Sequence, residues 1–117
     1  MKENNLIQLK SYGFALEIIS VYKSLVSREK EFVLSKQLLR SGTSIGANIE
    51  EAIGAQTRKD FFSKITISYK EARESHYWIR LLFDAEYIKQ EEKTTLLELN
   101  DEILRIIGSI QRTLRNS

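Results

Sequence analysis

Apolar residues recur at alternating intervals of three and four along most of the chain, which is the spacing of one face of an α-helix. The longest unbroken repeat lies in a segment predicted to be helical up to about Glu86. Thr57 precedes this segment and Asp60 follows three residues later, so the Thr57 hydroxyl is predicted to cap the helix. The repeat comprises Phe62, Ile65, Tyr69, Ala72, His76, Ile79 and Phe83. Such a seam is typical of helices packed in a bundle.

Two further helices are predicted earlier in the chain, over about residues 8–26 and 31–55. In the first, one apolar stripe is predicted to face the core, and a second stripe flanks it at Phe14, Ile18, Val21 and Leu25. The predicted core stripe consists of Tyr12, Ala15, Ile19, Tyr22 and Val26. In the second helix the predicted inward positions are Leu34, Leu38, Ile45, Ile49 and Ala52.

A fourth helix is predicted over about residues 91–114. Its predicted seam consists of Leu96, Asn100, Ile103, Ile107, Ile110 and Leu114. The chain has no proline and only five glycines, so it lacks the turn residues that an all-β or α/β fold needs. Short polar links imply that consecutive helices are antiparallel. The sequence therefore predicts an all-α fold, an antiparallel up-down-up-down four-helix bundle that forms a single domain over residues 1–117.

Composition is that of an ordinary globular protein, with 42% hydrophobic and 29% charged residues in 117. The chain has no cysteine, which excludes a disulfide scaffold, a thiolate metal site and a cysteine nucleophile. Neither a signal peptide nor a membrane-spanning apolar run is visible, so we expect a cytoplasmic protein.

Positive charge gathers near the C-terminus, although the net charge of the chain is only +2. The last fifteen residues contain Arg105, Arg112 and Arg115 but no acidic residue, and helical spacing places the three on roughly one face. Together with Arg58, Lys59 and Lys64 from another surface, they are candidates for contacts with nucleic-acid phosphates. The alternative for a single subunit is a solvated charged face.

Small and polar residues interrupt the second predicted helix. Gly42 and Gly46 lie four apart, on one face, where they would allow another backbone to approach closely. Asn48 falls on an apolar stripe, and a buried amide must find hydrogen-bond partners. We predict a structural polar network that joins Asn48 to Glu50 or Glu51 and to a polar residue of the third helix. Candidates on that helix are Arg73, Glu71 and Tyr69.

A metal centre or a catalytic pair has little support in the sequence. A di-iron bundle needs the Glu-x-x-His motif twice, whereas His76 is the only histidine and Arg73 stands three residues before it. Glu50 and Glu51 are adjacent, so on a helix they point about 100° apart and do not face one substrate. We therefore expect no metal, no cofactor and no enzymatic activity.

The third predicted helix carries more apolar residues than one seam needs. These extra residues either widen the core or meet another subunit, and self-association is the preferred interpretation. They are Phe61, Ile67, Trp78, Leu81 and Leu82.

Two runs of the sequence resemble a known family. One is Ser-Ile-x-Ala-Asn-Ile-x-Glu, which begins at Ser44, and the other is Lys-Glu-Ala-x-Glu-x-x-Tyr-Trp, which begins at Lys70. Together they resemble the small four-helix-bundle proteins encoded in intervening sequences of bacterial 23S ribosomal RNA genes. Members often carry glycine where this chain has Ala52. The resemblance implies a bundle that assembles into a ring-like, fivefold homo-oligomer without established enzymatic activity.

A relative by fold, the accessory protein of diversity-generating retroelements, resembles a basic pentameric ring that engages nucleic acid and a reverse transcriptase. A ring would multiply the modest basic patch of one subunit. The leading functional hypothesis is thus a non-enzymatic, oligomeric protein that binds RNA or DNA without reading sequence. The alternative is a protein-interaction scaffold or adaptor that recruits a nucleic-acid enzyme such as a reverse transcriptase. An enzyme is a third and weaker hypothesis.

Overall fold

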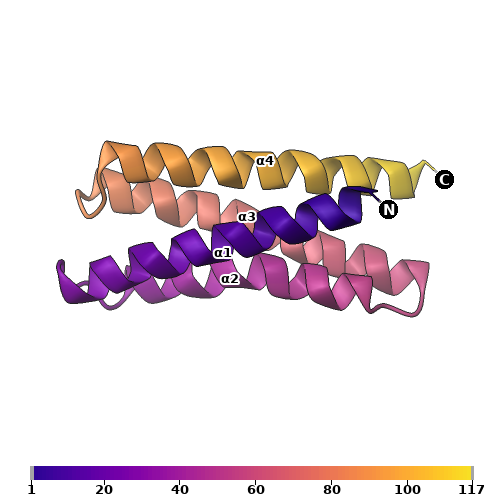
Figure 1. Cartoon of the computed structure of the whole chain (residues 1–117), viewed down its shortest axis with the longest axis horizontal. Helices are drawn as coiled ribbons and strands as arrows, with labels where there is room; N and C mark the ends of the chain where they lie inside the picture. Colours follow the sequence, from indigo (N-terminus) through magenta and orange to yellow (C-terminus); the bar gives the residue numbers. More distant parts are fainter. Residues whose placement is uncertain (1, 117) are drawn as a thin grey trace.

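Four helices make up the fold, as seen in a computed structural model that describes residues 2–116. They are α1 (Lys2–Ser27), α2 (Leu34–Ile53), α3 (Arg58–Asp84) and α4 (Gln90–Arg115). The helices run alternately up and down in a bundle of 47 × 21 × 19 Å, and both chain ends lie at one end of it (Figure 1). Each helix packs against two others, α1 and α3 each lying between α2 and α4. The predicted all-α up-down four-helix bundle is confirmed. No helix in residues 2–116 is long and apolar enough to cross a membrane.

Capping residues set where two of the helices begin. The Thr57 hydroxyl accepts a hydrogen bond of 3.0 Å from the Asp60 N–H at the start of α3, as predicted. Helix α2 begins at Leu34 rather than at the predicted Glu31. The Glu31 carboxylate instead accepts hydrogen bonds from the N–H groups of the first turn, so this residue caps the helix from outside it.

The core confirms the predicted inward stripes of the second and fourth helices almost residue by residue. In α4 the predicted seam is buried from Leu96 to Ile110, and in α2 from Leu38 to Ala52. In α3 the buried residues include the predicted Ile65, Ala72 and Ile79, together with two serines and a leucine that were not part of the predicted seam. The added residues are Ser68, Ser75 and Leu82.

The predicted core face of the first helix is wrong. Tyr12 is 70% exposed, while the stripe that was expected only to flank the core supplies its buried residues. Helix α1 carries apolar residues on nearly all sides, so their spacing alone does not identify the inward face. It also begins near Lys2, well before the predicted residue 8. The buried apolar residues of α1 are Ile7, Phe14, Ile18, Val21 and Leu25.

Small residues bring α2 close to both of its neighbours. A Cβ atom added to Gly42 would lie 2.8 Å from Cγ1 of Ile18, so the glycine allows α1 to pack directly on α2. On the other side, the Ser75 hydroxyl donates to the Ser41 hydroxyl at 2.9 Å. The Ser68 hydroxyl donates to the Ile45 carbonyl, also at 2.9 Å. The hydroxyls of Ser75 and Ser68 therefore each find a hydrogen-bond partner on α2 across the α2–α3 seam.

Candidate functional site

An open groove runs between α3 and the C-terminal half of α4. Four arginines line it, and none of its lining residues is acidic. Arg105 and Arg112 are seven residues apart on α4, so they lie on one face about 10 Å apart along the axis. Arg115 continues this row, and Arg73 contributes from α3 across the groove. The remaining lining residues are Tyr69, Leu104, Gly108 and Gln111.

Among the side chains that the structure describes, no carboxylate forms an ion pair with an arginine of this arginine groove. Ion pairs there join other side chains, namely Lys10 with Glu102, Arg40 with Glu74, and Lys64 with Glu51. All four groove arginines are exposed, and the guanidinium of Arg115 lies 5.7 Å from the centre of the Phe62 ring. Exposed and unpaired guanidinium groups of this kind are well suited to phosphate oxygens.

The three other predicted phosphate contacts are divided between two surfaces. Arg58 donates to the Leu114 carbonyl at 3.1 Å, which places it beside the end of α4 and near the groove. Lys59 is exposed in the first turn of α3. Lys64 forms a 2.8 Å ion pair with Glu51 on the α2–α3 side, and the hydrogen bond to that carboxylate raises the lysine pKa. Lys64 therefore lies outside the groove.

The structure does not bring together the polar network predicted around Asn48. This amide is only partly buried and donates to the Ser44 carbonyl of its own helix at 2.9 Å. Glu50 accepts from the Gln8 amide at 3.0 Å, and Glu51 is paired with Lys64. Neighbouring residues on a helix point about 100° apart, which explains why these side chains have different partners. Arg73, the proposed member from the third helix, lines the arginine groove instead.

The fully buried amide is Asn100, which the apolar seam of the fourth helix had already placed inward. Its Nδ2 donates to the Ala72 carbonyl at 3.0 Å across the α3–α4 contact. Its Oδ1 is buried and has no hydrogen-bond partner in the structure. An amide in this position favours one register of α4 against α3, because a shifted helix would leave both of its polar atoms unpaired.

The predicted glycine pair lies against α1 of the same chain. Gly42 packs tightly on Ile18, whereas a Cβ atom at Gly46 would make an ordinary contact of 3.4 Å with the Ser11 hydroxyl. Gly42 therefore allows a close contact between helices of one subunit, whereas the space at Gly46 would also accept a Cβ atom. The sequence alone did not show whether the approaching helix belongs to the same subunit or to another one.

His76 lies at the edge of the α3–α4 contact and near the arginine groove. Its Nε2 is 3.5 Å from an oxygen of Asp101, and its Nδ1 accepts a hydrogen bond of 3.0 Å from Nε of Arg80. Burial lowers the histidine pKa, opposed by Asp101 and reinforced by Arg80 and Arg73. The imidazole is thus neutral at pH 7. Within residues 2–116, no group of three or more histidine, aspartate or glutamate side chains is placed to hold a metal ion.

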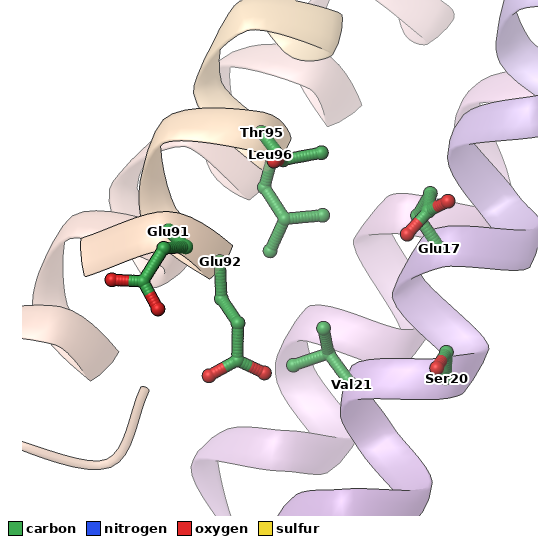
Figure 2. A pocket seen from close by; sticks show the side chains of 7 residues that line it. All are labelled: Glu17, Ser20, Val21, Glu91, Glu92, Thr95 and Leu96. Atoms are coloured by element: carbon green, nitrogen blue, oxygen red, sulfur yellow. The ribbon is translucent and has the colours of Figure 1, made fainter. Parts of the chain in front are cut away.

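A second open pocket, between α1 and the start of α4, has the opposite charge. Figure 2 shows Glu17 on α1 facing α4, with the side chain of Glu92 extending toward Val21. Glu91 belongs to the same first turn of α4. Glu92 also accepts a hydrogen bond of 2.9 Å from the Lys89 N–H at the helix start. The acidic pocket and the arginine groove therefore lie toward opposite ends of α4.

The extra apolar residues of α3 mostly widen the core of the chain itself. Leu82 is fully buried, and Phe61 and Trp78 pack against the core. The apolar face that no other helix covers lies on α1 instead. There Leu9 is 73% exposed and Leu16 is 56% exposed, with Tyr12 between them. We call these three residues the α1 outer face.

Four antiparallel helices with an arginine groove define a small helical-bundle protein with an exposed cationic surface. Residues 3–109 match the family described as 23S rRNA-intervening sequence protein, and the chain belongs to this family. It is similar to a crystal structure from Bacteroides thetaiotaomicron, described as a protein of unknown function from the S23 ribosomal protein family. The two are 48% identical with a TM-score of 0.92, over 94% of this chain and 98% of the other. No curated protein matches the chain significantly.

Proposed function

We propose that the chain is a non-enzymatic protein that binds the phosphate backbone of structured RNA in the arginine groove, as part of a homo-oligomer. The observation that carries this proposal is the convergence of Arg73, Arg105, Arg112 and Arg115 on one open groove without an acidic neighbour in its lining. Guanidinium groups bind phosphate oxygens with two hydrogen bonds, and such contacts carry no information about base sequence. Binding is therefore expected to follow RNA structure and charge rather than sequence.

Charge reversal tests the groove directly. The variant changes Arg105, Arg112 and Arg115 to glutamate, and its binding to a fluorescein-labelled RNA hairpin is followed by fluorescence anisotropy. We expect binding to be lost, because the substitutions remove three cations and place three anions beside the phosphates. For the unmodified chain, about four phosphate contacts predict a fall in affinity of about 100-fold between roughly 50 and 200 mM salt.

A matched control separates the groove from overall charge. Lys23, Arg28 and Lys36 are exposed outside the groove, and their reversal changes the net charge by the same amount, from +2 to −4. The control is expected to retain most of the binding. The proposal is wrong if both variants bind RNA equally well, or if the unmodified chain does not bind at low salt.

Self-association is supported by the α1 outer face. A helix that is apolar on all sides is usually buried on all sides, and here no helix of the same chain covers Leu9, Tyr12 or Leu16. A ring of five subunits, the arrangement that the family resemblance implies, would repeat the arginine groove around its circumference. Repetition would raise the overall affinity without any new contact in each subunit.

A protein-interaction scaffold or adaptor is the second candidate. It is favoured by exposed apolar residues at Phe32 and Val33, in the connection between α1 and α2, which could bind another protein such as a nucleic-acid enzyme. Binding of a protein partner there would survive the arginine reversals, because its contacts are apolar. Loss of RNA binding in the reversed variant, with no loss in the control, favours RNA binding in the arginine groove over a role as a scaffold.

A further inference from the structure

Helices α1 and α2 lie side by side (Figure 1), and a hollow of about 170 Å³ opens between them next to the α1 outer face. We call it the α1–α2 hollow. Tyr12, the middle residue of the α1 outer face, is part of its lining. A second hollow shares Gln8, Tyr12 and Glu50 with it and extends to Leu9, so the two form one groove. The small residues of the α1–α2 hollow are Ser11, Ala15, Thr43, Gly46 and Ala47.

The hydroxyl groups of the α1–α2 hollow already have partners within their own helices. Thr43 donates to the Leu39 carbonyl at 2.7 Å, and Ser11 donates to the Gln8 carbonyl at 3.3 Å. An apolar side chain can therefore enter the hollow without depriving either hydroxyl of its hydrogen bond.

The charge of the groove does not suit nucleic acid. Glu50 is the charged residue in the lining of both hollows, and its carboxylate accepts a hydrogen bond of 3.0 Å from the Gln8 amide. A carboxylate at this position would repel phosphate, whereas it does not hinder an apolar side chain that packs beside it. The groove thus differs in chemistry from the arginine groove.

The chain itself exposes side chains of the kind that would fit. Leu9 is 73% exposed and Leu16 is 56% exposed, and both lie on the α1 outer face beside the groove. A cavity of about 150 Å³ has room for a benzene molecule, so the hollow of about 170 Å³ has room for the side chain of one leucine.

The exposed apolar area is large enough for an interface between two copies. Together with Leu6, which lies one turn before Leu9, the α1 outer face exposes about 400 Å² of side-chain surface. Each partner in a stable interface contributes about 800 Å². The leucines and the groove beside them therefore supply the apolar centre of such an interface, and no other helix of the chain covers either of them.

We propose that the α1–α2 hollow is the docking site for the α1 outer face of a second copy of this chain, with Leu9 or Leu16 of that copy seated in the hollow. This inference rests on the self-association that is part of the proposed function, and it does not depend on RNA binding. The contact joins two different surfaces, so it can repeat from one subunit to the next and close into a ring.

Filling the hollow tests the docking site. The hollow-filled variant combines Gly46→Ala with Ala47→Gln. A Cβ atom fits at position 46, and Ala47 is exposed, so the fold should be retained. We expect the dissociation constant for self-association to rise at least about 30-fold, the cost of losing one central interface contact. Light scattering after size-exclusion chromatography over a range of concentrations measures it, and circular dichroism checks the fold. Ser63→Gln, at an exposed position of α3 outside both hollows, is the matched control and should associate like the unmodified chain.

A mixing experiment tests whether the leucines and the hollow meet each other. The leucine-truncated variant combines Leu9→Ala with Leu16→Ala and keeps the hollow, whereas the hollow-filled variant keeps the leucines. Each variant alone is expected to be monomeric. An equimolar mixture should form a one-to-one heterodimer in native mass spectrometry, because one intact leucine face and one intact hollow remain. Two monomers in the mixture would overturn the inference.

The remaining outcomes separate this inference from the proposed self-association. If the unmodified chain is an oligomer and the hollow-filled variant has the same mass and dissociation constant, self-association stands and the docking site is wrong. If the unmodified chain is monomeric at every concentration, the proposed self-association fails and the docking site fails with it. Neither result changes the test of RNA binding by arginine reversal.

Discussion

At Gly42 a single hydrogen atom separates the α2 backbone from the side chain of Ile18. An added methyl group would lie 2.8 and 3.0 Å from the two γ-carbons of this fully buried isoleucine. We expect Gly42→Ala to lower the free energy of unfolding by about 1–3 kcal/mol, the usual cost of overpacking a core. Urea denaturation measures the change. Gly13→Ala, which meets open space, should instead gain about 0.5–1 kcal/mol, and a stable Gly42→Ala variant would contradict the close packing of α1 on α2.

The Glu31 carboxylate gives stability a dependence on pH. Burial alone would raise its pKa, but hydrogen bonds from the N–H groups of Leu34, Ser35 and Val33 outweigh it and hold the pKa below the ordinary value. A lowered pKa means that the carboxylate stabilises the fold at neutral pH, and that this contribution is lost as the pH falls through the folded-state pKa.

Glu31→Gln should therefore unfold about 1 kcal/mol more easily than the unmodified chain at pH 7, the usual cost of weakening a helix cap. The difference should shrink as the pH falls below the ordinary glutamate pKa and through the lower folded-state pKa, where the native carboxyl becomes protonated. Chemical denaturation at a series of pH values measures it, with Glu29→Gln at an exposed neighbouring position as the control. A difference that does not change with pH would show that the charge of Glu31 is not what caps α2.

At the scale of the elements, two residues that follow helix ends adopt a backbone conformation that is unfavourable for a non-glycine residue. Lys30 and Glu86 have φ angles of 55° and 68°, in the left-handed region where glycine is preferred. Glu86 follows α3, where the Tyr87 N–H bonds to the Leu82 carbonyl and the Glu86 N–H to the Phe83 carbonyl, the pattern of a Schellman cap. Lys30 lies in the connection that follows α1.

Lys30→Gly and Glu86→Gly are each expected to raise the free energy of unfolding by about 1 kcal/mol, because glycine removes the strain of the left-handed conformation. Thermal and urea unfolding measure both changes. Glycine at Lys36, an exposed residue within α2, should be destabilising by a similar amount. Destabilisation at all three positions would argue against left-handed backbone at the helix ends.

Helical periodicity was sufficient to predict the elements but not every face. The seam of α4 and the cap at Thr57 follow from local spacing and local hydrogen bonds, so both were predictable from sequence. The face of α1 was not, because apolar residues surround that helix and the choice between two stripes depends on its neighbours. Glu31 was placed inside α2 because its capping role depends on how the preceding connection folds back.

For the molecule as a whole, the arginine groove and the acidic pocket lie toward opposite ends of α4. Part of this followed from the sequence, since Arg105, Arg112 and Arg115 share a helix face wherever α4 packs. The position of Arg73 in the same groove could not be predicted from the sequence, because it depends on the register of α3 against α4. The acidic residues Glu17 and Glu92 line one pocket near the start of α4 for the same tertiary reason. A phosphate backbone such as that of RNA would thus be attracted to the part of α4 that lines the arginine groove.

The α1 outer face predicts the state of association. Changing both Leu9 and Leu16 to lysine should convert the proposed oligomer to a monomer without unfolding it, because both side chains are exposed within the subunit. Light scattering after size-exclusion chromatography gives the mass, and circular dichroism checks the fold. Val33→Lys, at a similarly exposed apolar position outside α1, should leave the mass unchanged. A monomeric unmodified chain would rule out the proposed assembly through this face.

An even number of antiparallel helices returns the chain to the end at which it began, so both termini emerge on the side where α4 finishes (Figure 1). Arg112 and Arg115 lie in the last turns of that helix. A purification tag or reporter attached at the start of α1 or at the end of α4 would therefore lie near the cationic groove, where an acidic tag would compete with phosphate for the guanidinium groups. A label is better attached at exposed Glu29, in the connection between α1 and α2 at the far end of the bundle.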